Sequence, residues 1–185
     1  MDEAPDRQAE PPHRALRVRL QTPDDWARVR DLRLEMLADT PLAYLERVED
    51  ARRLTDEDWQ RRISTWAPGR GEAFALTDAE DRWLGQCSVT LDRWSNPTRV
   101  WVGAVYVTPA ARGGGGAGML MAAASRWARA IDHHELWLEV NDHNPRAIAF
   151  YEREGWVRTG AVRPYPLDPE GSSELEMVKR LDGDD

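Results

Sequence analysis

The fold is decided by the stretch Val105-Tyr106-Val107-Thr108-Pro109-Ala110-Ala111-Arg112-Gly113-Gly114-Gly115-Gly116-Ala117-Gly118. Its apolar start predicts a strand, and the residues after it predict a helix over 116–131. Because residues 113–118 carry no side chain larger than a methyl group, their backbone can approach an anion closely. The unpaired amides that open a helix point toward such an anion, and the helix dipole attracts it. The stretch therefore predicts a phosphate cradle between a strand and a helix.

The composition indicates one acidic domain. The 185 residues are 41% hydrophobic and include nine tryptophans, enough apolar surface for one sizeable core. The net charge of −8 argues against a nucleic acid or an anionic membrane as partner, because both would repel the protein. Residues 1–14 are charged, hold three prolines and lack an apolar period, so we expect a disordered tail there and a single domain over 15–182.

The cysteine count and the lack of long apolar stretches indicate in which cellular compartment we expect the protein. Cys87 is the only cysteine and has no internal disulfide partner, which favours a reducing compartment and a role as a small buried hydrophobe. No stretch approaches the roughly 20 apolar residues of a membrane span. The first residues lack the basic and apolar regions of a signal peptide. We therefore expect a cytoplasmic protein.

The remaining patterns predict alternating strands and helices. Residues 99–108 are nearly all apolar, which predicts a central strand buried on both faces, and Gly103 inside it suggests a bulge. Together the elements give an α/β domain with a strand and helix pair at its centre. Strands are expected over 16–20, 73–77, 83–91, 135–141, 156–162 and 174–181, and helices after Thr22, after Thr55 with the apolar stripe Trp59, Ile63 and Trp66, and from Asn144-Pro145 to Gly155.

The glycine cluster must be distinguished from other phosphate-binding loops. A Walker A loop is excluded, because Met119 and Leu120 follow Gly118 where a lysine and a hydroxyl residue are needed. The dinucleotide pattern G-x-G-x-x-G matches at Gly113, Gly115 and Gly118, but four consecutive glycines satisfy almost any spacing. A dinucleotide-binding oxidoreductase is thus a weaker alternative. A glycine-rich surface linker does not fit the flanking strand and helix.

A third pattern fits this stretch better. The sequence Val107-x-Pro109-x-x-Arg112-Gly113-x-Gly115-x-Ala117-x-x-Leu120 resembles the acyl-coenzyme A signature of the GCN5-related N-acetyltransferases (GNAT), in which R-x-x-G-x-G/A cradles the pyrophosphate. This resemblance implies a mixed, largely antiparallel central sheet flanked by helices. It also implies transfer of an acetyl group from acetyl-coenzyme A to a primary amine, on a small molecule or a peptide, directly within a ternary complex.

A second stretch carries the same resemblance. Leu136-Trp137-Leu138-Glu139-Val140, followed by Asn144, Ala147, Tyr151 and Gly155-Trp156, resembles the family's motif of a strand and N-x-x-A-x-x-x-Y-x-x-x-G-F/W. Within the family it looks most like the acetyltransferases of ribosomal-protein N-terminal alanines. The implied coenzyme contacts are Val105, Tyr106 and Val107 through a bulged backbone, Arg112, Gly113, Gly114, Gly115, Gly116, Ala117 and Gly118 around the pyrophosphate, and Asn144, which can also cap a helix.

Tyr151 and Glu139 are the candidate catalytic residues. Tyr151 either packs in the core or, as the resemblance implies, protonates the departing thiolate; the reference pKa values are about 10 for tyrosine and about 8.5 for a thiol. Glu139 is either a solvated strand carboxylate or a general base, since an amine must lose a proton before it attacks a thioester. The similar ribosomal-protein enzymes have a glutamate twelve residues before the tyrosine, and this chain has the same spacing.

The sequence also bears on a metal site, an alternative function, dimerisation and the acceptor. Asp132-His133-His134-Glu135, with His143 nearby, suggests a metal site, but adjacent histidines do not share one face and no second ligand pair follows, so no metal is expected. A non-catalytic acyl-coenzyme A sensor with the same fold stays an alternative. Homodimers are frequent in the family, although no residue here indicates one. Tyr44, Glu46, Glu49 and Asp50 either line a pocket for a cationic amine or form a solvated loop.

Overall fold

The computed structural model describes residues 15–64, 70–93 and 97–181. The expected tail over 1–14 and the expected contact of Trp66 lie outside these residues. The elements are β1 (Arg17–Leu20), the 3₁₀ turn η1 (Pro23–Asp25), α1 (Trp26–Asp39), α2 (Val48–Ala51), α3 (Asp56–Ser64), β2 (Gly71–Thr77), β3 (Trp83–Asp92), β4 (Arg99–Val107), the 3₁₀ turn η2 (Pro109–Ala111), α4 (Gly116–Ala130), β5 (Glu135–Asn141), α5 (Pro145–Arg153), β6 (Val157–Pro164) and β7 (Ser173–Arg180).

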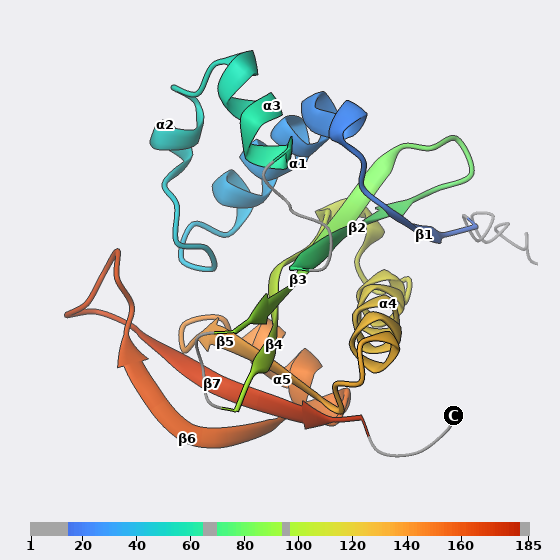
Figure 1. Cartoon of the computed structure of the whole chain (residues 1–185). Helices are drawn as coiled ribbons and strands as arrows, with labels where there is room; N and C mark the ends of the chain where they lie inside the picture. The colour runs from blue at the N-terminus through green and yellow to red at the C-terminus, as the bar shows by residue number, and fades with distance from the viewer. Residues whose placement is uncertain (1–14, 65–69, 94–96, 182–185) are drawn as a thin grey trace, which may run out of the picture.

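The strands form one sheet in the order β1-β2-β3-β4-β5-β7-β6. Neighbouring strands are antiparallel, except that β4 and β5 are parallel and joined through α4. Helices α1, α2 and α3 gather on one side of the sheet and α4 on the other (Figure 1). The mixed, largely antiparallel sheet flanked by helices is the architecture that the sequence predicts.

The two parallel strands are paired near their beginnings. The register joins Val100 to Leu136 and Trp101 to Trp137. Farther along, a small cavity of about 60 Å³ lies between residues 102–105 of β4 and residues 139–141 of β5. We call it the strand cavity. The central pair of strands therefore opens in the middle of the sheet.

A bulge in β4 lies beside this opening. The register with β3 shifts between Gln86, which pairs with Tyr106, and Ser88, which pairs with Gly103. The predicted bulge is thus confirmed, but its strained residue is Ala104, with φ of +50°, rather than Gly103. A bulge is a place where a strand tolerates such a conformation and where its pairing ends locally.

The bulge exchanges the faces to which β4 side chains point. Val100 and Val102 pack in the core beneath α4, and after the extra residue Val105 and Val107 do so too. Tyr106 instead joins the core formed with α1 and α3. Because strand side chains alternate between the two faces, one extra residue is enough to change the parity. The strand therefore contributes side chains to the cores on both faces of the sheet.

Some details differ from the sequence expectations. β4 is central, as predicted, but it is not buried on both faces, since Trp101 and Gly103 are only half-buried. Leu20 in β1 is an exposed apolar residue, with 49% of its surface accessible, because it ends a short edge strand. The connection between the first two predicted helices holds the four-residue helix α2, whose single turn is too short for a hydrophobic period.

Candidate functional site

The predicted cradle lies at the N-terminus of α4. Gly115 occupies the N-cap position with φ of +79°, and no side chain caps this helix end. The amide of Met119 bonds the carbonyl oxygen of Gly115 at 3.1 Å, as the first complete helical turn requires. The amides of residues 116–118 precede this turn and have no acceptor within the helix. They form the kind of donor set that binds phosphate.

The glycines of the cradle have different roles. Gly113 and Gly115 have φ near +80°, and a Cβ atom on either would meet no atom within 4 Å. Their lack of a side chain therefore serves the backbone conformation and leaves space on the cavity side. Gly116 instead allows close packing, because its Cβ would lie 2.4 Å from Cδ2 of Leu76.

A cavity of about 440 Å³ opens beside the cradle, and we call it the cradle cavity. Every sequence-predicted coenzyme residue except Gly114 lines it, and Tyr151 lines it as well. Sequence reasoning missed several further lining residues, among them Arg146, Phe150 and Arg153 on α5 and Glu154 directly after it. The two arginines lie seven positions apart and so share one helix face, a spacing that could have indicated them.

Two groups that were predicted to contact the coenzyme form hydrogen bonds within the protein. The Nε of Arg112 donates to the carbonyl of Val107 at 3.0 Å, and its guanidinium also pairs with Asp39. The hydroxyl of Tyr44 donates to the carbonyl oxygen of Val105 at 2.8 Å. The bulge was expected to free this backbone for the coenzyme. In the structure the Val105 carbonyl instead accepts a hydrogen bond from a tyrosine in the loop after α1.

Asn144 has the predicted capping role. Its side chain accepts a hydrogen bond from the amide of Ala147 at 3.2 Å, and Pro145 follows as the first helical residue. Asn144 also lines both the cradle cavity and the strand cavity. The cap thus fixes the start of α5 beside the opening between β4 and β5, and it orients the helix that carries Tyr151.

Tyr151 lies where the two cavities meet. It lines both of them and is 7% exposed, with its ring packed edge-on against Trp156 at a centroid distance of 5.7 Å. Among the described residues its hydroxyl has no hydrogen-bond partner. Burial raises the pKa of this phenol well above its ordinary value, so it is a neutral hydrogen-bond donor at physiological pH. Both the packing and the chemical interpretations of Tyr151 agree with this placement.

Glu139 lines the strand cavity from β5. Its side chain is 25% exposed, and its Oε1 accepts a 2.5 Å hydrogen bond from Arg163 of β6. The pKa of Glu174 on β7 is raised, first by burial and second by the negative charge of nearby Glu139. The structure thus brings Glu139 and Tyr151 to the walls of one cavity, although they are twelve residues apart in the chain.

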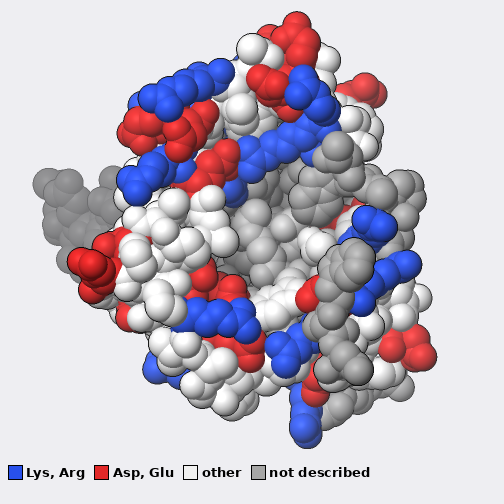
Figure 2. Space-filling model, turned by 60° about the vertical axis from the view of Figure 1, so that its left-hand side comes forward, with Lys and Arg blue, Asp and Glu red and all other residues white. Residues whose placement is uncertain are grey.

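The acidic residues of the loop after α1 do not form one surface toward the site. Glu46 is bound by two arginines, and Glu49 and Asp50 are exposed on α2. Tyr44 is the member of this group that lines both cavities. Figure 2 shows the face that carries α2, where blue and red side chains alternate around a hollow. In this view the coloured side chains form no continuous acidic surface.

Other sequence features lie outside the cradle cavity and the strand cavity, or lack a site. Cys87 is buried, and burial raises the pKa of its thiol to about 12. Over residues 15–64, 70–93 and 97–181, no group of three or more His, Cys, Asp or Glu side chains could hold a metal ion. In the same part of the chain, no helix has the length and apolar character that crossing a bilayer requires.

Comparison with known proteins places these features in a family. No curated protein matches the chain. Among solved structures, a GNAT-family acetyltransferase from Streptococcus pneumoniae superposes with a TM-score of 0.74 at 20% identity, covering 89% of this chain and 99% of that one. A spermidine N-acetyltransferase from Vibrio cholerae in complex with CoA and spermine gives 0.73 at 16% identity, with coverages of 90% and 95%. Nourseothricin acetyltransferase gives 0.56 at 27% identity, with coverages of 62% and 67%.

The match of the sequence to a family model identifies the family. Residues 30–156, more than half of the chain, match the model of the Acetyltransferase (GNAT) family. This range contains α4 with its cradle, the bulged strand and all of the second motif. The solved structures named above share the fold of these elements. The protein is therefore a member of the acetyltransferase (GNAT) family.

Proposed function

We propose that the protein transfers an acetyl group from acetyl-coenzyme A to a primary amine, directly within a ternary complex. The observation that carries this proposal is one continuous arrangement: the glycine cradle, the bulged strand and the buried Tyr151 line the same cavity. Family membership supports an acetyltransferase, and the geometry supports the assignment of roles.

The coenzyme fits the cradle cavity on two grounds. The open space over Gly113 and Gly115 would admit a pyrophosphate against backbone amides. The guanidinium groups of Arg112, Arg146 and Arg153 would supply positive charge beside it. The backbone of residues 105–107 and Asn144 would then hold the pantetheine arm toward the strand cavity.

The chemistry needs a proton to leave the amine and a proton to reach the thiolate. Glu139, directly or through water, would accept the first, after which the amine attacks the thioester carbonyl. Tyr151 would donate the second to the departing sulfur, yielding the amide and the coenzyme thiol. The similarity of the second motif to the enzymes of ribosomal-protein N-termini supports both roles. The thiol of Cys87 stays protonated and buried, which agrees with direct transfer.

The experiment is a panel of amines and peptides with acetyl-coenzyme A, followed by thiol release. Tyr151→Phe keeps the ring packing and removes the hydroxyl, so we expect kcat to fall by about 10²–10⁴ while coenzyme affinity is unchanged. An unchanged kcat would exclude Tyr151 as the acid. Coenzyme binding by the wild type without thiol release from any acceptor would instead identify a non-catalytic acyl-coenzyme A sensor.

A further inference from the structure

The cradle cavity and the strand cavity meet at a junction. Among the described residues, those that line both cavities are Tyr44, Val105, Asn144, Ala147 and Tyr151. Val105 comes from β4, and Asn144, Ala147 and Tyr151 belong to α5 or cap it. Tyr44 comes instead from the loop between α1 and α2. It therefore forms a wall of the junction that neither the sheet nor α5 provides.

Tyr44 is held in place from three directions. Its hydroxyl donates a hydrogen bond to the carbonyl oxygen of Val105 at 2.8 Å, and its own carbonyl oxygen accepts one from the hydroxyl of Tyr165 at 2.6 Å. The guanidinium carbon of Arg33 lies 5.3 Å from the centre of its ring. Burial raises the pKa of the Tyr44 phenol, so the hydroxyl stays protonated and keeps its bond to Val105. The ring is therefore a fixed wall rather than a freely rotating side chain.

The strand cavity offers little space beside this wall. Its volume is about 60 Å³. A water molecule takes up about 30 Å³ in the liquid, and a methyl group is of similar size, so the cavity has room for about two such groups. In the proposed reaction these are the methyl group of the acetyl moiety and the attacking nitrogen. Each further carbon of a longer acyl chain would need space that the walls do not leave.

The other walls of the strand cavity are fixed by the core. Val102 and Val140 are buried in the core beneath α4, and Tyr151 packs edge-on against Trp156. A packed core accepts an extra methylene only by forcing side chains from their rotamers or by shifting the backbone. Tyr44 is thus the large side chain in the wall whose removal leaves the sheet and α5 in place.

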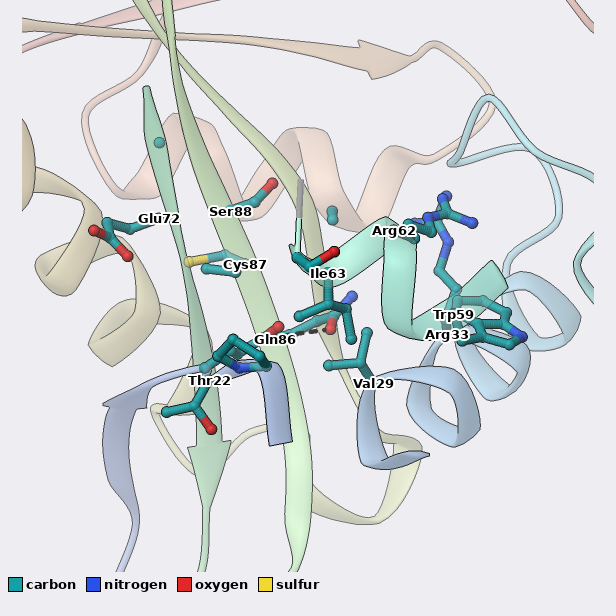
Figure 3. A pocket seen from close by; sticks show the side chains of 16 residues that line it. Thr22, Val29, Arg33, Trp59, Arg62, Ile63, Glu72, Gln86, Cys87 and Ser88 are labelled. Atoms are coloured by element: carbon teal, nitrogen blue, oxygen red, sulfur yellow. Dashed lines mark hydrogen bonds between the residues drawn. The ribbon is translucent and has the colours of Figure 1, made fainter. Parts of the chain in front are cut away.

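Tyr44 also lies near a larger cavity. This cavity measures about 320 Å³ and is enclosed by α1, α3 and strands β2 and β3, so we call it the α1–α3 cavity. Figure 3 shows Gln86 on one side of it, Arg33 on the other, and Val29 and Ile63 between them. The ring of Tyr44 lines the strand cavity and packs against Arg33, which lines the α1–α3 cavity. Removal of the ring would therefore extend the strand cavity toward Arg33.

We propose that Tyr44 limits the length of the acyl group that the protein transfers, so that acetyl-coenzyme A is used and butyryl-coenzyme A is rejected. This inference rests on the proposed acetyl transfer. The methyl group of an acetyl moiety fits beside the ring of Tyr44, whereas the last two carbons of a butyryl chain would overlap the ring or take the place of the amine. One methylene in a fitted pocket changes kcat/KM by about 10–200-fold.

The test measures thiol release with acetyl-, propionyl- and butyryl-coenzyme A, on the amine with which acetyl transfer is fastest. For the wild type, we expect kcat/KM with acetyl-coenzyme A to exceed that with butyryl-coenzyme A by about tenfold or more, with the propionyl donor between them. Equal use of the acetyl and butyryl donors by the wild type would overturn this inference and leave the proposed acetyl transfer intact. Thiol release from no donor with any amine would overturn both.

Two truncations of Tyr44 locate the effect. Tyr44→Ala should bring the ratio of acetyl to butyryl kcat/KM close to one, and Tyr44→Leu, which leaves a shorter side chain, should bring it part of the way. Partial unfolding lowers both rates alike, so the ratio reports the wall itself. An unchanged ratio in these variants would refute the role of Tyr44.

Two control variants separate the ring from its surroundings. Tyr44→Phe keeps the ring and removes the hydroxyl, so its ratio should stay close to that of the wild type. Leu42→Ala changes the same loop, but Leu42 is 37% exposed and is not among the residues that line either cavity. Its ratio should equal that of the wild type. A loss of discrimination in Leu42→Ala as large as in Tyr44→Ala would overturn the assignment to the ring.

Discussion

Replacement of Gly115 by leucine tests the cradle most directly. Gly115 has φ of +79°, and a Cβ atom there meets nothing within 4 Å, so the folded protein has room for the side chain. The remaining cost is backbone strain of about 1–2 kcal/mol. For a domain of this size, that strain lowers Tm by about 2–8 °C. The same space is the proposed position of the pyrophosphate, so coenzyme binding should be lost.

Gly160 provides the matched control. It has φ of +91° and equally open surroundings, but it lies in the exposed strand β6 and does not line the cradle cavity. At a coenzyme concentration of one hundred times Kd, we expect the wild type and Gly160→Leu to gain about 2.7 kcal/mol of stability, and Gly115→Leu to gain none. Thermal unfolding and calorimetry measure both effects. Undiminished coenzyme stabilisation of Gly115→Leu would refute the cradle.

Three further predictions concern single side chains. Glu139→Gln should lower kcat by about 10²–10⁴, whereas Arg163→Gln removes the ion pair, keeps the carboxylate and should retain turnover; equal losses would indicate a structural role. Iodoacetamide should not label folded Cys87, because burial holds the thiol pKa at about 12, and mass spectrometry checks this. Asp25 has a pKa lowered to about 2, first by its bond from Arg19, so Asp25→Asn should cost about 2 kcal/mol of unfolding free energy at pH 7. That cost should shrink as the pH falls from about 4 toward 2, as denaturation at each pH would show.

The parts of the site that could be predicted are those whose backbone is determined by residues adjacent in the sequence. The cradle follows from a glycine run between an apolar strand and a helix, and Gly115 takes the expected place at the start of α4. Asn144 and Pro145 open α5 as their capping chemistry requires. In each case a few consecutive residues determine the local backbone, so one sequence window is enough to recognise it.

The parts that were missed depend on residues that meet only after folding. Glu46 is 13 residues from Arg33 and 16 from Arg62, and three separate elements bring them together. From the sequence alone, Glu46 looked like one member of an acidic loop. The bulge was expected at Gly103, the residue with the greatest backbone freedom, yet Ala104 carries the positive φ. The position of an extra residue is set by pairing with β3, which a single strand's sequence does not contain.

The bulge in β4 changes which side chains face each side of the sheet. Without the extra residue at Ala104, the alternation of β4 would carry Val105 and Val107 to the face of α1 and α3, and Tyr106 to the face of α4. Tyr106 would then enter the core beneath the cradle, and the apolar wall of the cradle cavity would be lost. A deletion of Ala104 should therefore impair coenzyme binding as well as stability. This single register shift therefore sets which side chains β4 presents on each face of the sheet, including those that line the proposed coenzyme site.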